Sequence, residues 1–580
     1  MTGSGARGLV LPLLFYLPIT ALLLAPHVTP WTEYSTQTFD SLDAHISMWS
    51  LWWTGQALSQ LHNPFWTDHV FFPRGTSLAF HSYPFVYGML SIPLQHMVPG
   101  KPGLAIAFNA LIVASFVLSS VAAYRLTLHV TRSRPGALIA GLIYAFMPYH
   151  ILNSCRLAVL AIEIMPLYVF SLLRLHETRS WRWTAAVSLC LGLAYYNSVE
   201  YALYLLLFSA LWLAHRVYTR DPGIDRVLLG RLAAAALLLA LAAAPLLVQQ
   251  LQVAAAESRA VGHKLADATH WSAALASFVT PNRVHPLFGG LWAFAGEFRD
   301  GVTHGMRSET ALGWTPLLLA ALAFADRRER PLFWGGCALV FFGLCLGPYL
   351  RLTGDWATSI PLPYYLLYEV FPPLRAVKEP TRMFPLAMLL LSVLAGFGVR
   401  SLVQRLGARP RRALALTGLL GAAILFEYLT AWPWQRTPHA SVAVAPFYAR
   451  LAREPEAVSI MDLTGPDATL EAQPVHGKKS VEWLGFLPRA AVTSSQSALF
   501  ELGRVLTDPR TLLAHDPASR AARLAQYRSA LRAARTRYIL LPPLAGERRA
   551  FAQAVADALG GWLRQEPGML LIELPLPAPD

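Results

Sequence analysis

The sequence has little charge for its length. Only 14% of its 580 residues are Asp, Glu, Lys or Arg, whereas 55% are hydrophobic. A soluble globule needs charged residues to cover its surface, and a disordered chain is poor in Leu, Ile, Val and Phe, so this composition excludes both classes. With a mean hydropathy of +0.41, the chain is expected to be a membrane protein.

Cysteine and the common catalytic motifs are also scarce. Four cysteines cannot form a disulfide framework in a chain of this length, and no CxxC or Cys/His metal spacing occurs. The sequence contains no P-loop, nucleophile elbow, HExxH or Rossmann fingerprint. These absences exclude ATP-driven transport and nicotinamide chemistry.

Long apolar runs are the main positive signal. A bilayer core of about 30 Å requires about 20 helical residues. Eleven runs of roughly this length predict transmembrane helices, at about 8–27, 104–128, 135–149, 158–174, 183–196, 199–214, 228–251, 310–325, 331–349, 383–403 and 412–431. The first run is interpreted as a retained span, because no small-x-small cleavage pattern follows it.

The positive charge reports the topology of these spans. The formal net charge is +14, and Arg gathers in the short alternate connections, for example at Arg132, Arg179, Arg220, Arg327 and Arg405. The positive-inside rule places that side in the cytoplasm, so the amino terminus is predicted inside and the carboxyl end outside. The charge therefore does not indicate a nucleic-acid partner. The proline-broken stretch 84–99 is expected at the outer face rather than across the bilayer.

The opposite side carries the long connections. Outer loops are predicted at 28–103, 252–309 and 350–382 within a transmembrane region 1–434, and long loops of this kind are usually functional. The tail, 435–580, is more charged and predicts an extracytoplasmic α/β domain. Its expected strands are 458–463, 537–541 and 569–574, and its expected helices are 495–507, 517–534 and 546–558.

The first outer loop brings acidic residues to the membrane surface. Asp40 and Asp43 lie three residues apart and precede a Trp-rich stretch, 46–61. This stretch predicts an amphipathic helix whose Trp face lies in the lipid interface. The simplest role of Asp43 is to cap that helix, and a chemical role is the alternative.

Several motifs resemble one family. The loop acid, the Trp six residues after Asp43, and the aromatic-Pro-x-Gly-x-x-Leu-Ala turn at 72–79 resemble the first loop of bacterial GT-C superfamily membrane glycosyltransferases. Further runs are similar to uncharacterised members of that group, at 108–111, 141–150, 309–313 and 373–382. The likeness covers about residues 8–430 and implies a polytopic helical fold of about 11 transmembrane helices.

The resemblance implies sugar transfer outside the cytoplasm, from a polyprenyl-phosphate-linked donor to a glycan, lipid or protein acceptor. The first-loop acid would take the proton of the acceptor hydroxyl. Asp43 matches this position best by its spacing to Trp49, and Asp40 is second. The choice stays open, because this chain lacks the Gly that commonly precedes the acid in relatives.

The resemblance also leaves a divalent metal ion as an open alternative, because some relatives use one to neutralise the leaving phosphate. Asp40, Asp43 and His45 would then be the candidate ligands. The donor phosphate itself needs cations, and Arg375, Lys378 and Arg382 lie on a side that is otherwise poor in positive charge. Their alternative role is to anchor a span to lipid headgroups.

Four further ionisable residues are candidates for the polar lining of a cavity: Glu163, Glu200, Glu309 and His81. An acid inside an apolar run costs about 2.5 to 3.5 kcal/mol and so needs a reason. Glu163 is expected to pair with Arg156, and Glu200 would otherwise lie in a solvated outer turn. Glu309 falls in a family-like motif. In the tail, His476 is expected in a surface turn.

Two functions of other classes remain open. A transporter or flippase would predict paired discontinuous helices in two similar halves, and no such symmetry is seen in the sequence. A non-catalytic receptor or scaffold would use the outer α/β domain to bind a partner.

Overall fold

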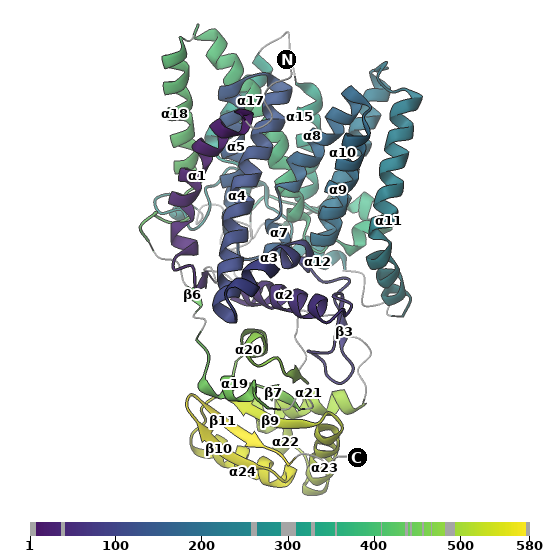
Figure 1. Ribbon diagram of the computed structural model, residues 1–580, viewed down its shortest axis with the longest axis vertical. Coiled ribbons are helices and arrows are strands. Elements are labelled where there is room, and N and C mark those ends of the chain that lie inside the picture. Colours follow the sequence, from purple (N-terminus) through teal and green to yellow (C-terminus); the bar gives the residue numbers. More distant parts are fainter. Residues whose placement is uncertain are drawn as a thin grey trace.

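The computed structural model describes residues 7–35, 41–256, 264–291, 309–325, 331–353, 357–407, 409–435, 439–440, 443–454, 458–465, 467–481 and 494–575. These residues form a long helical bundle with a small α/β domain at one end (Figure 1). The predicted fold class, a polytopic helical protein with a carboxyl-terminal α/β domain, is confirmed.

Each of the eleven predicted spans overlaps one main bundle helix. These helices are α1 (Arg7–Val28), α4 (Lys101–Thr131), α5 (Arg134–Phe146), α8 (Ile164–Thr178), α9 (Trp181–Asn197), α10 (Val199–Tyr218), α11 (Arg226–Ala256), α14 (Trp314–Leu322), α15 (Leu332–Cys345), α17 (Phe384–Arg405) and α18 (Pro410–Glu427). Seven segments of the described chain are long and apolar enough to cross a membrane, and two shorter apolar helices overlap α14 and α15.

The centre and the rim of the bundle differ in burial. Helix α17 is buried almost all round, and it packs closely on α5, where a Cβ on Gly136 would lie 2.3 Å from the carbonyl oxygen of Gly396. Small residues of this kind let transmembrane helices approach at backbone distance. Helix α11 instead exposes large aliphatic side chains such as Leu237 and Leu241, as a lipid-facing helix does.

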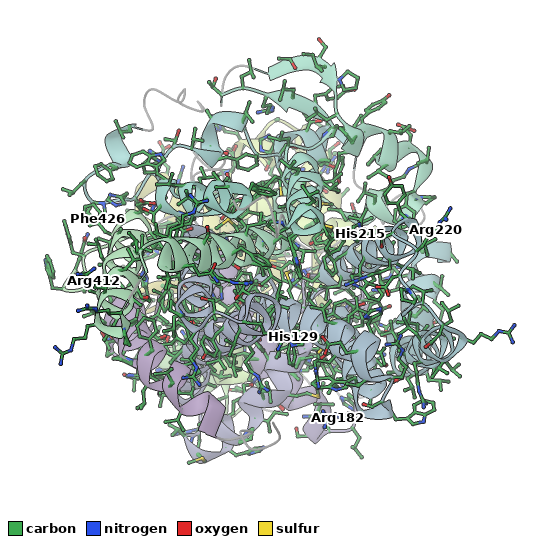
Figure 2. The ribbon with its side chains drawn as sticks, turned by 90° about the horizontal axis from the view of Figure 1, so that it is seen from above. His129, Arg182, His215, Arg220, Arg412 and Phe426 are labelled. Carbon is green, nitrogen blue, oxygen red and sulfur yellow. The ribbon has the colours of Figure 1, made fainter. Side chains whose placement is uncertain are left out.

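The Arg-rich connections gather at one end of the bundle. The links from α4 to α5, α8 to α9, α10 to α11 and α17 to α18 lie at the upper end in Figure 1, opposite the α/β domain. Figure 2 views the molecule from that end and labels Arg182, Arg220 and Arg412. The Arg-rich connections therefore share one end of the bundle, as the charge pattern predicts.

The other end carries elements that lie across the bundle. Helix α2 (Ser41–Ser59) runs across this end beside α3 (Phe85–Met97), so residues 84–99 lie flat, as expected (Figure 1). Shorter elements complete this end: α6 (Pro148–Leu152), α7 (Leu157–Leu160), α12 (Leu265–His270), η1 (Leu275–Phe278), α16 (Pro363–Val370), η4 (Pro372–Ala376) and η5 (Pro380–Met383). The short turn η3 (Ala323–Ala325) follows α14 at the other end, where the Ala325 carbonyl accepts a hydrogen bond of 3.1 Å from Arg405. Three two-stranded pairs lie among them: β1 (Tyr34–Ser35) with β6 (His439–Ala440), β2 (Trp66–Thr67) with β3 (Thr76–Ser77), and β4 (Tyr349–Arg351) with β5 (Ala357–Pro361).

Two expectations for α2 were wrong. The helix begins at Ser41, so Asp43 lies inside its first turn and is not its cap. The Trp face does not lie in the lipid interface, because Trp49, Trp52 and Trp53 are 2%, 6% and 3% exposed. Protein covers them, since α2 lies between the bundle and α20 (Ala468–His476) of the α/β domain.

The α/β domain is built on one five-stranded sheet of order β10-β11-β9-β7-β8. Its strands are β7 (Ser459–Asp462), β8 (Lys479–Ser480), β9 (Thr536–Leu541), β10 (Trp562–Glu566) and β11 (Met569–Glu573). Strand β7 pairs in parallel with β8 and β9, whereas β11 pairs antiparallel with β9 and β10. The predicted strands therefore coincide with β7, β9 and β11.

Helices cover both faces of this sheet. Along β9, Ile539 and Leu541 face one apolar core, while Tyr538 and Leu540 face another, because successive side chains of a strand alternate between faces. The first core includes α21 (Ser494–Thr507), α22 (Arg510–Leu513), α23 (Pro517–Ala533) and α24 (Gly546–Leu559), and the second includes α19 (Pro446–Leu451) and α20.

Candidate active site

A cavity of about 330 Å³ lies where the crosswise elements meet the bundle. Six segments contribute to it: helix α2, the loop that follows it, the start of α7, the turn between α9 and α10, the end of α11 and the segment before α17. Its main polar lining residues are Asp43, Ser47, His81, Ser82, Arg156, Asn197, Ser198, Glu200, Gln250, Lys378, Glu379 and Arg382. Residues from six separate segments thus face one space.

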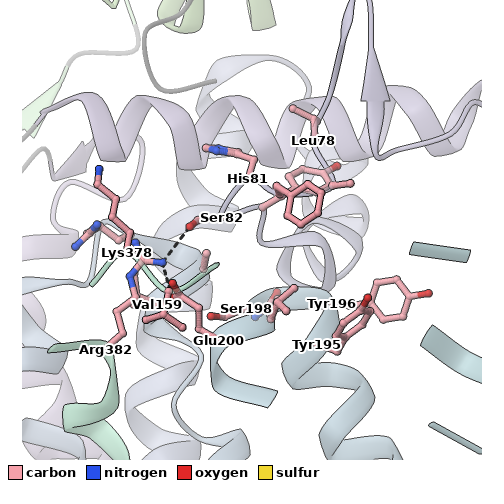
Figure 3. A pocket seen from close by; sticks show the side chains of 18 of the residues that line it. Leu78, His81, Ser82, Val159, Tyr195, Tyr196, Ser198, Glu200, Lys378 and Arg382 are labelled. Carbon is pink, nitrogen blue, oxygen red and sulfur yellow. Dashed lines mark hydrogen bonds and ion pairs between the residues drawn. The ribbon is translucent and has the colours of Figure 1, made fainter. Parts of the chain in front are cut away.

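Ion pairs connect one end of the cavity into a continuous chain. Asp43 Oδ2 lies 2.9 Å from Arg156 Nε, and Arg156 Nη2 lies 3.3 Å from Glu379 Oε1. Glu379 also accepts two hydrogen bonds from Arg382, at 2.9 and 3.1 Å. The other side of the Arg382 guanidinium donates to Glu200 Oε2 at 2.7 Å (Figure 3). Three carboxylates and two guanidinium groups therefore hold one another in place.

Local structure places the first two members of this chain. Asp43 lies in the first turn of α2, where a negative charge is favoured by the helix dipole. Arg156 precedes α7, and its Nη1 donates to Asn153 Oδ1 at 3.1 Å. The two segments are joined directly, because the backbone N–H of Leu157 donates to Ser47 Oγ at 3.2 Å.

Burial and charge act in opposite directions on the acids at this end. Burial raises the pKa of Glu379, but Arg382 and Arg156 outweigh it and hold that pKa at about 2. Glu379 is therefore a carboxylate at neutral pH. The nearby charges raise the pKa of Arg156 against its burial, so this guanidinium stays charged.

The predicted phosphate-binding residues separate into two groups. Lys378 and Arg382 line the cavity, whereas Arg375 is exposed and donates to the backbone carbonyls of Tyr368 and Glu369, at 3.1 and 3.0 Å. Lys378 makes no ion pair with an acid of the described chain, and its Nζ lies 5.2 Å from the ring centre of Trp271. Lys378 is thus the cavity cation with most capacity for a bound anion.

Two of the four predicted polar candidates line the cavity. Glu200 is bound to Arg382 and is not simply solvated in a turn. His81 also lines it, and burial followed by the charge of Arg382 lowers the pKa of His81 to about 4. A neutral His81 therefore faces the cavity at physiological pH.

The other two candidates lie behind the cavity wall. Glu309 Oε2 accepts a hydrogen bond of 2.5 Å from Asn153, the residue that also holds Arg156. Burial raises the pKa of Glu309 to about 8, against the opposing effects of Arg156 and Asn153. The expected pairing of Glu163 with Arg156 was wrong: Glu163 accepts hydrogen bonds from Tyr87 and Ser115, at 2.7 and 2.8 Å.

The two candidate metal ligands that the structure describes, Asp43 and His45, do not converge on one point. Asp40 lies outside the described residues. Asp43 points to Arg156, whereas His45 lies on another side of α2, with its Nδ1 at 3.1 Å from Asp467 Oδ2. No three His, Cys, Asp or Glu residues of the described segments form a metal-ligand group. Asp43 and His45 therefore do not form a metal site with one another or with the other described residues.

The opposite end of the cavity is aromatic and aliphatic. Phe65, Tyr83 and Tyr196 gather there, with Phe65 at 5.6 Å from Tyr83 and 5.8 Å from Tyr196 between ring centres. The phenolic groups are already engaged, since Tyr195 donates to Gln250 Oε1 at 2.6 Å and Tyr196 to the Ala242 carbonyl at 2.8 Å. Figure 3 shows both tyrosines on the side away from Lys378 and Arg382.

The motif turn of the first outer loop closes the β2–β3 hairpin beside this end. Gly75 has φ +74°, and a Cβ there would lie 2.5 Å from the Thr67 carbonyl oxygen. Only glycine fits this position without displacing the backbone. The glycine of the aromatic-Pro-x-Gly motif therefore has a structural reason.

Sequence reasoning missed two members of the ion-pair chain. Glu379 stands in the quoted run 373–382, and its spacing of three residues from Arg382 is a signal for a local ion pair. Arg156 was assigned to the wrong acid, because Asp43 and Glu379 are 113 and 223 residues away from it and no local spacing indicates them.

His476 was also placed wrongly. It is 4% exposed at the end of α20, with its ring stacked on Tyr448 at 5.7 Å between centres. Burial, followed by the charge of Lys478, lowers the pKa of His476 to about 3. It is a neutral core residue rather than part of a surface turn.

Comparisons with known proteins agree with this architecture. No family model and no curated protein matches the chain. The crystal structure of ArnT from Cupriavidus metallidurans in the apo state is similar, with a TM-score of 0.51, 11% identity and coverage of 98% of each chain. This likeness shows that the two chains share an overall fold, which agrees with the fold that the first-loop resemblance predicts.

Two archaeal structures are also similar overall. The oligosaccharyltransferase of Archaeoglobus fulgidus, tethered with an acceptor peptide, has a TM-score of 0.48 at 12% identity, with 99% of this chain and 75% of that chain covered. AglB of the same organism, in complex with an inhibitory peptide and a dolichol-phosphate, has a TM-score of 0.46 at 11% identity, with 95% and 71% covered.

Proposed function

We propose that this protein is a membrane glycosyltransferase that moves a sugar from a polyprenyl-phosphate-linked donor to an extracytoplasmic acceptor hydroxyl. The observation that carries the proposal is the meeting of Asp43, Lys378 and Arg382 at one cavity, at the bundle end opposite the Arg-rich connections. By the positive-inside rule that end faces the outside of the bacterial inner membrane. The GT-C fold supports the same reaction class.

The chemistry at the acceptor rests on Asp43. The acceptor oxygen attacks the anomeric carbon, the carbon–oxygen bond to the donor phosphate breaks, and Asp43 takes the acceptor proton as attack begins. The phosphate leaves with the bonding electron pair. Arg156 holds Asp43 Oδ2 at 2.9 Å and so fixes the orientation of the carboxylate. The other carboxylate oxygen, Oδ1, then keeps one direction in which it can accept the proton.

The leaving phosphate needs positive charge that is already in place. Lys378 is available to bind it as a point charge, while Arg382 is fixed by Glu200 and Glu379 and contributes its field. Preorganised charge of this kind stabilises developing negative charge without reorganisation during the reaction. We therefore expect the donor phosphate to bind beside Lys378.

The donor lipid would occupy the aromatic and aliphatic end. The hydroxyls of Tyr195 and Tyr196 are already hydrogen-bonded to the protein. The surfaces left to contact a ligand are therefore the faces of the tyrosine rings and the side chains of Leu203 and Leu246. These surfaces suit isoprene units rather than a charged group. Leu246 belongs to α11, whose other side faces lipid, so the chain would leave the cavity towards the bilayer.

The test is turnover by the purified protein with polyprenyl-phosphate sugars. Asp43→Asn keeps the shape of the side chain and removes the base, so we expect kcat to fall by about 10² to 10⁴. Asp557→Asn is the matched control, because Asp557 is exposed on α24 of the α/β domain. Asp40→Asn runs in parallel, since Asp40 is the second candidate. Full turnover by both Asp40→Asn and Asp43→Asn would refute the catalytic assignment.

The receptor alternative predicts a different result. A scaffold whose outer domain binds a partner would tolerate both substitutions and lose its role when residues 435–580 are removed. The contacts between α20 and α2 do not favour a tail that acts alone, because the tail packs against the helix that carries Asp43.

A further inference from the structure

Helix α2 presents different residues to the cavity and to the α/β domain. Asp43, Ile46 and Ser47, at spacings of three and four, line the cavity. His45 and Trp49, which are four residues apart, contact α20 instead. One short helix therefore joins the candidate base to the carboxyl-terminal domain.

Gln473 is the centre of this contact. Its Oε1 accepts a hydrogen bond of 2.6 Å from Trp49 Nε1, and its Nε2 donates to the backbone carbonyls of His69 and Lys478, at 2.6 and 2.8 Å. The Gln473 side chain is fully buried and Trp49 is 2% exposed. One amide thus ties α2, the first outer loop and the end of α20 together with three hydrogen bonds.

Polar side chains reinforce the same contact nearer Asp43. His45 Nδ1 lies 3.1 Å from Asp467 Oδ2, and His45 Nε2 lies 3.7 Å from Glu471 Oε1. Lys101 Nζ, at the start of α4, also lies 3.7 Å from Glu471 Oε1. Glu471 therefore connects α20 to both α2 and α4.

The two halves of α2 are anchored to different parts of the molecule. The second half is tied to α3 by the hydrogen bond from Gln95 Nε2 to the Leu51 carbonyl at 3.0 Å, and to the loop before α3 by the contact of Thr54 with the Tyr83 hydroxyl at 2.6 Å. The first half, which carries Asp43, is held by α20 on one side and by Arg156 and Leu157 at the cavity. Trp49 lies six residues beyond Asp43, about 9 Å along the helix axis, so a displacement at Trp49 moves the candidate base as part of the same rigid element.

We propose that Gln473 of the α/β domain is a positioning residue, which sets the place of Asp43 in the cavity through its hydrogen bond to Trp49. This inference rests on the proposed function. A misplacement of about 1 Å at a reacting group can cost about a hundredfold in rate. The carboxyl-terminal domain is then a part of the active site rather than an independent module.

The test compares Gln473→Ala, Trp49→Phe and the double variant in the full-length protein. Each single variant is expected to lower kcat at least tenfold while the donor KM stays within about twofold, because Lys378 and Arg382 lie on another segment. The double variant should be no slower than the slower single variant, since both substitutions remove the hydrogen bond between Trp49 and Gln473, although Gln473→Ala also removes two bonds to backbone carbonyls. Trp49→Phe removes the indole N–H but keeps an aromatic ring in the same place. This variant therefore still tests the hydrogen bond if Gln473→Ala does not fold.

Gln496→Ala is the matched control. Gln496 is also a buried glutamine of the α/β domain, but its Nε2 donates to the Phe71 carbonyl at 3.2 Å, in the outer loop rather than in α2. We expect nearly full turnover from this variant. Amide hydrogen exchange should show faster exchange in the first half of α2 for Gln473→Ala and not for Gln496→Ala.

Three outcomes would overturn the proposal. One is a Gln473→Ala variant with the same kcat and α2 exchange as Gln496→Ala. Another is a double variant whose loss is the product of the two single losses. A rise in donor KM with unchanged kcat would also overturn it. If Asp43→Asn keeps full turnover, the assignment of Asp43 as the base fails instead, and the exchange experiment still reports whether Gln473 fixes α2.

Discussion

Glu379 provides a quantitative test of the ion-pair chain. The substitution Glu379→Gln keeps the size of the side chain but removes the charge between Arg156 and Arg382. The pKa of Glu379 is lowered from 4.5 to about 2, which corresponds to about 3 kcal/mol of stability at neutral pH. Removal of one partner from a buried ion pair typically costs about 3 to 5 kcal/mol, which agrees with this value. We therefore expect the variant to lose about 3 to 5 kcal/mol at pH 7.

The pH dependence gives the sign of the effect. Because the folded pKa of Glu379 lies below its unfolded value, its contribution is complete above about pH 4.5 and is lost as the pH falls towards 2. The difference between wild type and Glu379→Gln should thus shrink by about half between pH 7 and pH 3.

The assay is unfolding in mild detergent micelles, followed by circular dichroism as SDS is added. Glu369→Gln is the control, because the Glu369 side chain is half exposed and its contact with Arg375 is 3.8 Å long. Exposed pairs of this kind contribute less than about 1 kcal/mol. A Glu379→Gln variant that is as stable as Glu369→Gln at pH 7 would refute the ion-pair reasoning.

Three further predictions concern the cavity and its wall. Glu309→Gln should be more stable than wild type by up to about 3 kcal/mol at pH 7 and equally stable below about pH 4.5. The reason is that the raised pKa of Glu309 costs stability as the pH rises from 4.5 to about 8. Unfolding measured at the two pH values tests this difference. Arg382→Lys should raise the donor KM and lower kcat, since lysine cannot make the two-pronged contact with Glu379, whereas Arg375→Ala should leave both within about twofold. Leu203→Trp should fill the apolar end of the cavity and so raise the donor KM, which turnover against donor concentration measures. The stability of the protein should change little.

Much of the fold follows from local patterns in the sequence. The spans are long apolar runs, and the tail strands, such as β9, are short apolar segments between helical patterns. The position of α2 shows the limit of such patterns. Its Trp-rich surface is typical of an interfacial helix, but whether lipid or protein covers Trp49 depends on α20, more than 400 residues away.

The site was predictable in its parts and not in its connections. Asp43, His81, Glu200, Lys378 and Arg382 stand out as charged or polar residues near apolar runs or in motifs, and the fold brings all of them to one cavity. Which acid each arginine binds is set by long-range packing. Arg375 shows the same limit, since it is three residues from Lys378 but faces away from the cavity.

The most direct test of the account is a cryo-electron microscopy map of the protein with a polyprenyl phosphate bound. The account predicts phosphate density in the cavity, within hydrogen-bond reach (about 3 Å) of Lys378 Nζ, and lipid density along Leu203 and Leu246 towards α11. It also predicts that Asp43 borders the open space beside the phosphate. Phosphate bound outside this cavity, at Arg375 or at the Arg-rich end of the bundle, would contradict the central claim.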